Sequence, residues 1–410
     1  MHLQNEKQQK SVNQHTRIIV PDVIMNFGCI MGACEDNCCH NTTWSISIDS
    51  NSYMKYKELG GEVGQRILDC IDDSGPVFKM KQFEDGKCPL MTEGGLCYIH
   101  KELGLEYLSE TCKNYPRMYA FFSGHAEHWL SLSCPEVVRQ VLYSKKGISF
   151  LENKIAGHSP PQLKPLDEEK AMARRLLMNI VAYRELTIRE KLLYMGMFMR
   201  SIGKLDMNMK DHPQGFMQTV QNFLLGLSDA RNSLREVTNK LETGKSEARH
   251  NILISLATLA AQTVAQTATH PTGIKNELYY KLMESFRQDM ADGSTEQIVG
   301  TYDSLIVPYV NQKPHVFENY LMYSLMSTMF MSETNNFAEA YSGFAGEFVT
   351  MLTFTCLFKD YKTLGDEEIV TAIYLFHRRV SHNQFLRRQL AMMFQDSLLV
   401  FLVTALGGIK

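Results

Sequence analysis

The stretch Phe27–Cys39, which reads FGCIMGACEDNCC, is the most informative part of the chain. It opens a region, from Cys29 to Cys134, that holds nine of the ten cysteines in the sequence. Cysteines that serve only as small apolar core residues would be spread over the whole chain, so a local cluster needs a local cause. The candidates are disulfide bonds, a zinc site, an iron–sulfur cluster or a redox-active pair.

Composition indicates a globular protein without a strong charge bias. The chain has 410 residues, of which 44% are hydrophobic and 21% charged, and its net charge is -3. This charge provides no whole-molecule attraction to nucleic acid or to an anionic membrane. No run of about 18 uncharged apolar residues is present, so we expect no transmembrane helix and no membrane partner.

The beginning of the chain is polar and lacks the apolar segment of a secretory signal. We therefore expect a cytoplasmic protein, with residues 1–16 disordered. In a reducing compartment, clustered cysteines favour a bound metal over disulfide bonds.

The cysteine-rich part, residues 17–143, is expected to form a small α+β domain with short hairpins. Residues 17–25 read as an extended segment, and Pro21 argues against a central strand because proline cannot donate to a strand ladder.

A helix capped by Asp49 or Ser50 and ended by Gly60-Gly61 is expected within this domain, followed by a helix over residues 62–72. Two hairpins and one more helix complete it. Strands 118–123 and 128–133 flank a glycine turn, and a glycine-rich turn between Cys88 and Cys97 brings these two sulfurs near each other. Residues 98–112 are expected to be helical.

The second half of the chain has a helical pattern. Residues 144–166 contain several prolines and glycines and are expected to be a linker. Apolar residues then recur at helical spacing, for example Leu176, Ile180 and Tyr183. We expect a mainly α protein in which residues 167–410 form a large all-helical domain. The expected helices are 167–186, 187–203, 213–228, 229–243, 246–269, 275–291, 295–306, 314–332, 337–357, 366–380 and 383–407.

The cysteine spacing does not select one metal. The cysteines from Cys29 to Cys39 are separated by four, three and no residues, which differs from the paired CxxC knuckles of structural zinc sites. Four thiolates from separate parts of a chain can also hold a [4Fe–4S] cluster. Spacing alone leaves zinc and iron–sulfur equally open. Cys70 and Cys356 lie in expected helices and are predicted to be core residues.

The sequence resembles the flagellin lysine-N-methylase family. The resemblance is carried by the pattern F-x-C-x4-C-x3-C-C-x4-W-x-I-x-I-D over Phe27–Asp49 and by matching segments at 95–104, 107–117 and 131–136. The cysteine scheme is also similar to that of small zinc/iron-chelating domains. Shorter matching motifs follow near Glu318 and His382.

This resemblance implies an enzyme that methylates the ε-amino groups of surface lysines on flagellin. It implies S-adenosylmethionine as methyl donor and a cysteine-ligated [4Fe–4S] cluster, with zinc as the alternative metal. The sequence has no strand followed by a G-x-G-x-x-G turn, so the donor must be held in another way. The implied metal ligands are Cys29, Cys34, Cys38, Cys39, Cys88, Cys97, Cys112 and Cys134.

Methyl transfer to lysine requires a neutral amine, although the reference pKa of lysine is about 10.4. The enzyme must therefore desolvate the amine or supply a general base. The catalytic candidates are Tyr115, Arg117, Glu318, Tyr320 and His382. The candidates for holding the donor are Arg117, Asn319 and Arg379.

Each of these candidates also has a structural interpretation. Arg117 can cap loop carbonyls, residues 318–320 can form a solvated helix face, and His382 can be a structural histidine. The cluster itself can be structural, can bind the donor or can turn over by redox chemistry. The second hypothesis for the whole protein is a non-catalytic zinc- or iron-binding module on a helical scaffold for protein interactions.

Overall fold

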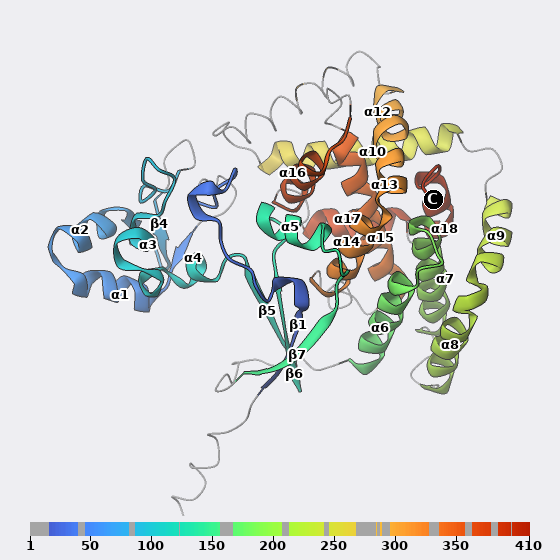
Figure 1. The fold of residues 1–410 in the computed structure, drawn as a ribbon, viewed down its shortest axis with the longest axis horizontal. Helices are drawn as coiled ribbons and strands as arrows, with labels where there is room; N and C mark the ends of the chain where they lie inside the picture. Colours follow the sequence, from blue (N-terminus) through green and yellow to red (C-terminus); the bar gives the residue numbers. More distant parts are fainter. Residues whose placement is uncertain are drawn as a thin grey trace, which may run out of the picture.

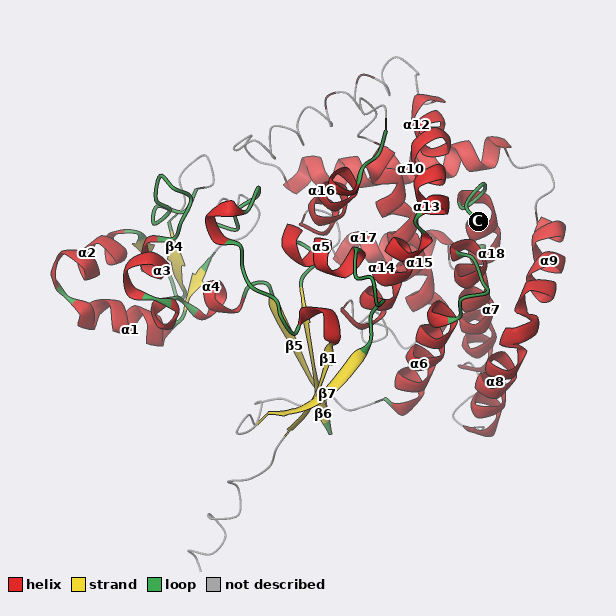
Figure 2. Ribbon diagram, in the orientation of Figure 1, coloured by secondary structure: helices red, strands yellow, loops and turns green. Residues whose placement is uncertain are grey.

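The computed structural model shows a small unit, a central sheet and a large group of helices arranged side by side (Figure 1). Helices account for most of the residues that the structure describes (Figure 2). Within the parts of the chain described, no helix is long and apolar enough to cross a membrane. The structure describes residues 16–39, 46–81, 87–122, 124–155, 167–206, 213–241, 246–267, 284, 288, 296–327, 336–356, 363–378, 384–394 and 396–410.

The small unit combines short helices with a three-stranded sheet of order β2-β4-β3. The Asp49 side chain caps the first helix by accepting a hydrogen bond from the Ser52 N–H at 2.9 Å, and Gly60 ends this helix. Both residues give the local signals expected for a helix start and stop. The elements of the unit are β2 (Ser47–Ile48), α1 (Ser50–Leu59), α2 (Gly61–Asp69), β3 (Ile71–Asp72), β4 (Phe78–Met80), α3 (Tyr98–Leu103) and α4 (Glu110–Asn114).

The prediction of a single helix over residues 98–112 is wrong. Gly104 has φ +92, a left-handed conformation that ends α3 after Leu103. A 3-10 turn follows, and the Ser109 hydroxyl then caps α4 by accepting from the Cys112 N–H at 3.4 Å. The interruption places Cys112 on a short helix of its own, whereas Cys97 is the extended residue that precedes α3.

A four-stranded mixed sheet of order β5-β6-β1-β7 connects the small unit to the helices. Strands β5 and β6 form the hairpin expected around Gly124, with Phe122 opposite His125, but the second strand begins and ends three residues earlier than expected. Within the sheet, β1 pairs in parallel with β6 and antiparallel with β7. The strands are β1 (Thr16–Pro21), β5 (Arg117–Phe122), β6 (His125–Leu130) and β7 (Phe150–Ile155).

Two expectations about this sheet are wrong. Strand β1 is interior, although Pro21 was expected to exclude a central strand. Pro21 is tolerated because it is the last residue of the strand and lies beyond Ile18 and Ile19, which pair with β6. In addition, residues 150–155 of the expected linker form β7, because their backbone pairs with β1 along its whole length.

The larger part of the molecule is a helical assembly built around α15 (Phe337–Thr355). Every residue from Ala340 to Thr355 is buried, as expected for a helix that is apolar on all sides. Helices α7, α10, α16 and α17 pack around it. The other helices are α5 (Pro135–Leu142), α6 (Glu168–Ala182), α7 (Ile188–Asp206), α8 (Pro213–Leu225), α9 (Ala230–Leu241), α10 (Ser246–Thr267), α12 (Glu296–Thr301), α13 (Val307–Gln312), α14 (Pro314–Ser327), α16 (Asp366–Phe376), α17 (Gln384–Phe394) and α18 (Leu398–Ala405).

Most of the expected helices are confirmed, with three exceptions. The helix expected over 383–407 is two helices, because the chain turns between α17 and α18. The helix expected over 295–306 ends in a π-helical turn that leads into α13. The helix expected over 275–291 lies outside the described residues apart from 284 and 288.

Hydrophobic side chains form two separate cores. One lies inside the small unit and includes Tyr56, Ile67 and Ile99. The other contains the helices and also the inner face of the mixed sheet, for example Val20 and Trp129. The core of the helices therefore reaches back into residues that precede the expected linker.

Candidate metal centre and its junction with the helices

Three sulfurs of the small unit interact directly. The Cys39 thiol is hydrogen-bonded to both Cys38 and Cys97, and these bonds lower the pKa of Cys97 to about 6 and that of Cys38 to about 7. The pKa of Cys39 is raised far above its usual value, because its proton is shared with these two neighbours. One loop and one hairpin, distant in sequence, thus bring three thiols together.

Two more thiols lie within electrostatic range of this group. Burial raises the pKa of Cys88 to about 12 and that of Cys112 to about 11, and in both cases the negative charge of Cys97 raises it further. The backbone aligns the two segments, because the Cys88 N–H donates to the Cys39 carbonyl at 2.9 Å. Asn37 also joins the loop to the hairpin through a hydrogen bond to the Gly95 carbonyl.

Cys34 and Cys134 form a second group at the boundary with the helices. Burial raises the pKa of Cys34 to about 11 and that of Cys134 to about 12. The positive charge of Arg378 opposes this rise at both thiols. Cys29 is exposed, and its sulfur accepts a hydrogen bond from the Met31 N–H at 3.4 Å. All ten cysteines are free thiols.

Backbone N–H groups point at several of these sulfurs. The sulfur of Cys88 accepts from Leu90, that of Cys97 from Ile99 and His100, and that of Cys134 from two residues at the start of α5. Such bonds favour the thiolate, which is the form that binds metal. Clustered thiolates are the ligands that iron–sulfur clusters and zinc prefer. The donor set therefore fits a thiolate-bound metal.

The sulfurs are nevertheless not in coordination geometry. Among the described residues, no group of three or more His, Cys, Asp or Glu side chains is arranged to hold a metal ion. Which of the eight expected cysteines ligate a metal therefore stays a prediction.

Arg378, at the end of α16, joins the cysteine loop to the helical core. Its guanidinium pairs with the Asp36 carboxylate at 2.8 Å, and both side chains are only 12% exposed. It also donates to the Asp36 and Ser133 carbonyls, each at 3.1 Å. One buried cation thus holds both the loop that precedes Cys38 and the residue that precedes Cys134.

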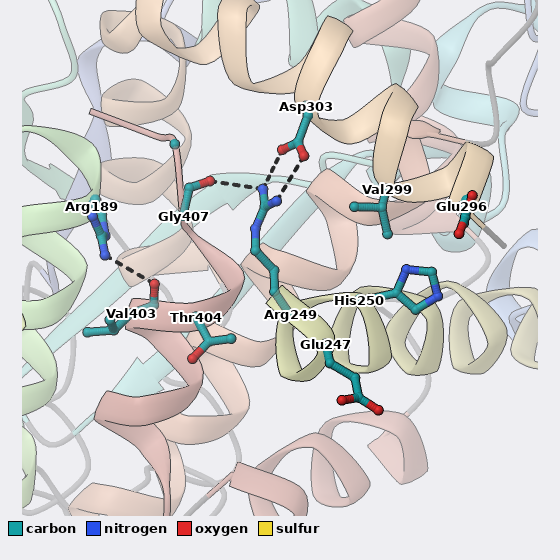
Figure 3. Close-up of a pocket in the computed structure, with 11 residues that line it drawn as sticks. Arg189, Glu247, Arg249, His250, Glu296, Val299, Asp303, Val403, Thr404 and Gly407 are labelled. Carbon is teal, nitrogen blue, oxygen red and sulfur yellow. Dashed lines mark hydrogen bonds and ion pairs between the residues drawn. The ribbon is translucent and has the colours of Figure 1, made fainter. Parts of the chain in front are cut away.

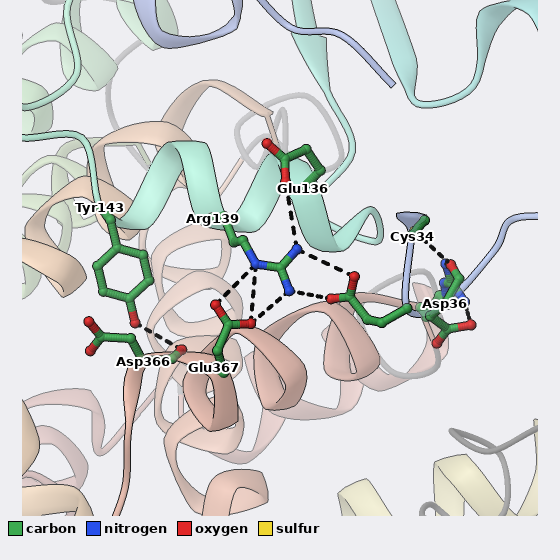
Figure 4. Close-up of polar contacts among 9 residues, drawn as sticks. Cys34, Asp36, Glu136, Arg139, Tyr143, Asp366 and Glu367 are labelled. Carbon is green, nitrogen blue, oxygen red and sulfur yellow. Dashed lines mark hydrogen bonds and ion pairs between the residues drawn. The ribbon is translucent and has the colours of Figure 1, made fainter. Parts of the chain in front are cut away.

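A second, more exposed ion-pair group lies beside it. Arg139 of α5 contacts the carboxylates of Glu35, Glu136 and Glu367, which come from the loop, from α5 itself and from α16. Figure 4 shows the carboxylates of Glu136 and Glu367 directed at Arg139, with Asp36 and Cys34 to one side of it. Sequence reasoning missed Arg139 and Arg378, although an arginine next to the apolar run of α16 signals a need for a buried partner.

Tyr115 is the only predicted catalytic residue, among those described, that contacts this junction. Its hydroxyl shares a hydrogen bond with the Ser133 hydroxyl at 3.1 Å, and burial raises its pKa well above the usual value. Arg117 begins β5, and its guanidinium lies over the Phe27 ring at 5.9 Å from the ring centroid. This contact is neither the carbonyl cap nor the carboxylate pair considered from the sequence.

The expected solvated helix face at residues 318–320 is wrong. Asn319 is 4% exposed and donates to two carbonyls at the end of α5, and Tyr320 is 2% exposed. The Tyr320 hydroxyl lies 3.1 Å from the Nε2 atom of His377. Glu318 forms an ion pair with Lys191, whose side chain is fully buried in α7. These side chains join helices to one another because α14 is enclosed between α5 and α7.

The structure describes only some of the remaining predicted residues. Arg379 and His382 lie outside the described residues. Cys356 is 2% exposed, which confirms the prediction of a core residue, whereas Cys70 is half-buried at the edge of the small core. The fold thus defines a class of protein in which a thiol-rich α+β unit is attached to a helical domain.

Comparison with known proteins identifies the family. The model of the FliB lysine N-methylase C-terminal domain matches residues 174–401, which is more than half of the chain. The chain therefore belongs to the FliB lysine N-methylase family. No solved structure matches it.

Named relatives come from Salmonella. The chain is 29% identical over 143 residues to the flagellar biosynthetic protein FliU of Salmonella muenchen. This match covers 33% of this chain and 82% of that protein. It is 28% identical to the lysine-N-methylases of Salmonella choleraesuis, over 141 residues, and Salmonella typhimurium, over 144 residues. These two matches cover 33% of this chain and 35% of each relative.

Proposed function

We propose that this protein is a protein-lysine N-methyltransferase that transfers methyl groups from S-adenosylmethionine to surface lysines of flagellin. The observation that carries the proposal is the family match over residues 174–401, together with relatives named lysine-N-methylase and flagellar biosynthetic protein. The proposed reaction takes place in the cytoplasm, before flagellin is exported.

The chemical step is a displacement at carbon. The lone pair of a neutral lysine Nζ forms a bond to the methyl carbon while the bond from that carbon to the sulfonium sulfur breaks. The sulfur leaves with the electron pair as the neutral thioether S-adenosylhomocysteine, and the methylated ammonium then loses a proton to a base or to water. The protein must align the two reactants and keep the amine neutral.

We further propose that the small unit binds a [4Fe–4S] cluster, with zinc as the alternative metal. Its ligands would come from the eight cysteines Cys29, Cys34, Cys38, Cys39, Cys88, Cys97, Cys112 and Cys134. When bound, the metal supplies a covalent cross-link between the loop and the two hairpins. The N–H groups directed at the sulfurs stabilise their thiolate form, and Arg378 keeps the loop docked on the helices.

The experiment uses anaerobically purified protein with flagellin and S-adenosylmethionine. Mass spectrometry of digested flagellin is expected to show lysines that carry added methyl groups, and iron and sulfide analysis is expected to show a bound cluster. A reaction without the methyl donor is the control. If metal analysis found stoichiometric zinc and no iron, the bound metal would be zinc and the cluster would be ruled out.

Absence of methyl-lysine in the complete reaction would contradict the enzymatic proposal. If flagellin bound under those conditions without turnover, and regardless of the donor, the metal-stapled binding scaffold would be the better description.

A further inference from the structure

A cavity of about 670 Å³ in the helical domain is lined by residues of α7, α10, α12 and α18 (Figure 3). Its arginines are engaged within the protein. Arg249 pairs with the Asp303 carboxylate at 2.9 Å, and Arg189 donates to the Val403 carbonyl at 3.1 Å. These contacts join the surrounding helices to one another. Polar groups with unused bonding capacity lie instead in the mixed sheet, at the edge formed by β5.

The two outer strands of the mixed sheet, β5 and β7, differ in how their edges are protected. Strand β7 carries the exposed charged residues Glu152 and Lys154. Charged side chains on an outer strand are a common protection against pairing with another chain. By contrast, β5 reads RMYAFF, with its single charge on Arg117 at the very start and with neither proline nor glycine. A six-residue segment of this composition pairs readily with a further strand.

The register of the hairpin shows which backbone groups of β5 point outward. The Pro116 carbonyl accepts a hydrogen bond from the Ser131 N–H at 2.8 Å, in the same register as the β5–β6 pairs. Along an antiparallel pair, residues alternate between bonding to the neighbouring strand and pointing away from it. The N–H and C=O groups of Arg117, Tyr119 and Phe121 therefore point away from β6. Within the described part of the chain, no hydrogen bond reaches these groups.

The side chains next to this edge are accessible and mostly apolar. Met118 is 43% exposed, and Tyr119 is 45% exposed. Arg117 is also exposed, and its guanidinium lies over the Phe27 ring. Among the described strands, β6 pairs with one side of β5, and no strand pairs with its other side. The edge thus combines unpaired backbone groups with apolar side chains that a partner strand would bury.

A second copy of β5 is complementary to this edge. In an antiparallel pairing about a two-fold axis at Tyr119, this residue lies opposite itself, and Arg117 lies opposite Phe121 of the second copy. The outward N–H groups of each strand then meet the outward C=O groups of the other, because the pairing joins the same three residues of both strands. The two Arg117 side chains start about 13 Å apart along the strands. This distance exceeds the screening length of about 8 Å at physiological salt.

We propose that two copies of this protein associate through β5, which joins their four-stranded sheets into one continuous sheet. The charge pattern favours a second copy over an unrelated strand, because the register sets each Arg117 against an aromatic ring rather than a like charge. Pairing of β5 with β7 would be head-to-tail and would continue from copy to copy, whereas pairing of β5 with β5 is complete after two copies. The paired strands connect each cysteine unit to its helical domain, so association fixes this connection in both copies.

The test measures the molar mass of anaerobically purified full-length protein by sedimentation velocity over a wide range of concentrations. The unaltered protein is expected to be a dimer. Tyr119→Pro removes the central outward N–H but no hydrogen bond of the β5–β6 ladder, and proline is accepted at such a position on an outer strand. This variant should raise the Kd for dimerisation about tenfold or more, with its circular dichroism unchanged.

The matched control is Glu152→Pro on β7, the opposite edge of the sheet. The Asp22 N–H donates to the Ser149 carbonyl at 2.8 Å in the register of the β1–β7 pairs, so the N–H of residue 152 also points outward. This control should remain a dimer.

A charge exchange at Tyr119 tests the two-fold register. Tyr119→Lys sets two like charges opposite each other across the axis, and so does Tyr119→Glu, so each variant alone should be monomeric. Mixing equal amounts of the two variants should restore the dimer, because a lysine then faces a glutamate. Tyr119 is 45% exposed, so both substitutions should leave the fold intact.

Several outcomes would overturn this inference. They are an unaltered protein that is monomeric at every concentration, a dimer that persists in both charge variants alone, and a mixture of these variants that stays monomeric. Equal loss of the dimer in Glu152→Pro would also contradict it. A monomer whose complex with flagellin is lost in Tyr119→Pro would assign the edge to a different protein and overturn the inference. Molar mass does not depend on methyl transfer, so the inference and the proposed function can fail separately.

Discussion

The small cysteine unit and the helical domain differ in how much apolar surface they bury. Among the residues that the structure describes, the core of the small unit contains eleven buried hydrophobic residues, among them Cys88 and Leu90 of the cysteine hairpin. In the helical domain, one helix, α15, is buried at every position from Ala340 to Thr355, and four further helices surround it. Domains below about 70–80 residues rarely obtain more than about 3–5 kcal/mol from a single core.

This difference teaches that the two regions depend on different sources of stability. The helical domain can rely on the burial of apolar side chains. The small unit has short strands of two or three residues and a limited core, and it concentrates its thiols where its loop and hairpin meet. A metal bound by those thiols would replace the missing core as a cross-link.

The largest expected effect follows from removing one central thiol. Cys97→Ser should abolish metal binding and unfold the small unit, because structural thiolate sites contribute on the order of 10 kcal/mol to folding. The helical domain should keep its helical circular dichroism. Iron and sulfide analysis of anaerobic protein, combined with limited proteolysis of the small unit, measures both effects.

The control for this change is Cys70→Ser. Cys70 is half-buried, its thiol donates to the Arg66 carbonyl at 3.3 Å, and its charge also contributes to the raised pKa of Cys88. Its substitution should leave the metal content intact. Loss of iron in this variant, or a full iron content in Cys97→Ser, would show that the wrong cysteines were assigned as metal ligands.

A smaller effect is expected at the contact between the two regions. Arg378→Gln removes the cation from a pair in which both side chains are 12% exposed, and breaking such a buried pair costs about 3–5 kcal/mol. Urea unfolding should show this loss, and hydrogen exchange should increase around Asp36 because the loop is released from α16.

Arg139→Gln is the matched comparison. Arg139 also binds the cysteine loop, through Glu35, but its side chain is 27% exposed and Glu367 is 66% exposed. Exposed pairs contribute about 0–1 kcal/mol, so this variant should lose little stability. Equal losses in the two variants would mean that burial does not decide the strength of the junction.

An effect smaller than that of Arg378→Gln concerns the mixed sheet and depends on pH. Burial by itself raises the pKa of Glu127, but hydrogen bonds from His125 and Arg174 outweigh it, and the pKa is lower than usual. The stabilising contribution of this carboxylate is therefore complete above the ordinary glutamate pKa of about 4.3 and is lost as the pH falls through the lower folded value.

Glu127→Gln should accordingly reduce the free energy of unfolding by about 1–3 kcal/mol at neutral pH. The difference from the unaltered protein should shrink as the pH is lowered below about 4.3. Urea unfolding across this pH range measures it. Glu152→Gln, on strand β7 of the same sheet and 57% exposed, serves as the control with little change. A difference that stays constant with pH would contradict the assignment.

The elements that were predicted correctly have local causes. Asp49 begins α1 through a cap to a residue three positions later, and Gly124 turns the hairpin between adjacent strands. The helices from α6 to α10 follow the apolar periodicity of their own segments. Grouping of the thiols was also predictable in outline, because nine of the ten cysteines are confined to one region of the sequence.

The errors have a common origin in contacts between distant segments. Strand β1, which ends at Pro21, is interior because β6 and β7 pair with its two edges from distant parts of the chain. Residues 318–320 appeared solvated from their polarity, yet Asn319 and Tyr320 are enclosed by α5 and α16. Polarity alone does not show whether a side chain will meet water or a buried partner.

The sequence by itself determined the thiol-rich region, the family and the mainly helical character of this protein. Each of these depends on residue type and on spacing between near neighbours, which the chain states directly. Only the tertiary structure decided which charges hold the loop to the helices and where a cavity remains. Arg378 and Asp36 are separated by 342 positions, and Arg249 and Asp303 by 54, so each pairing exists only after the intervening segments have packed.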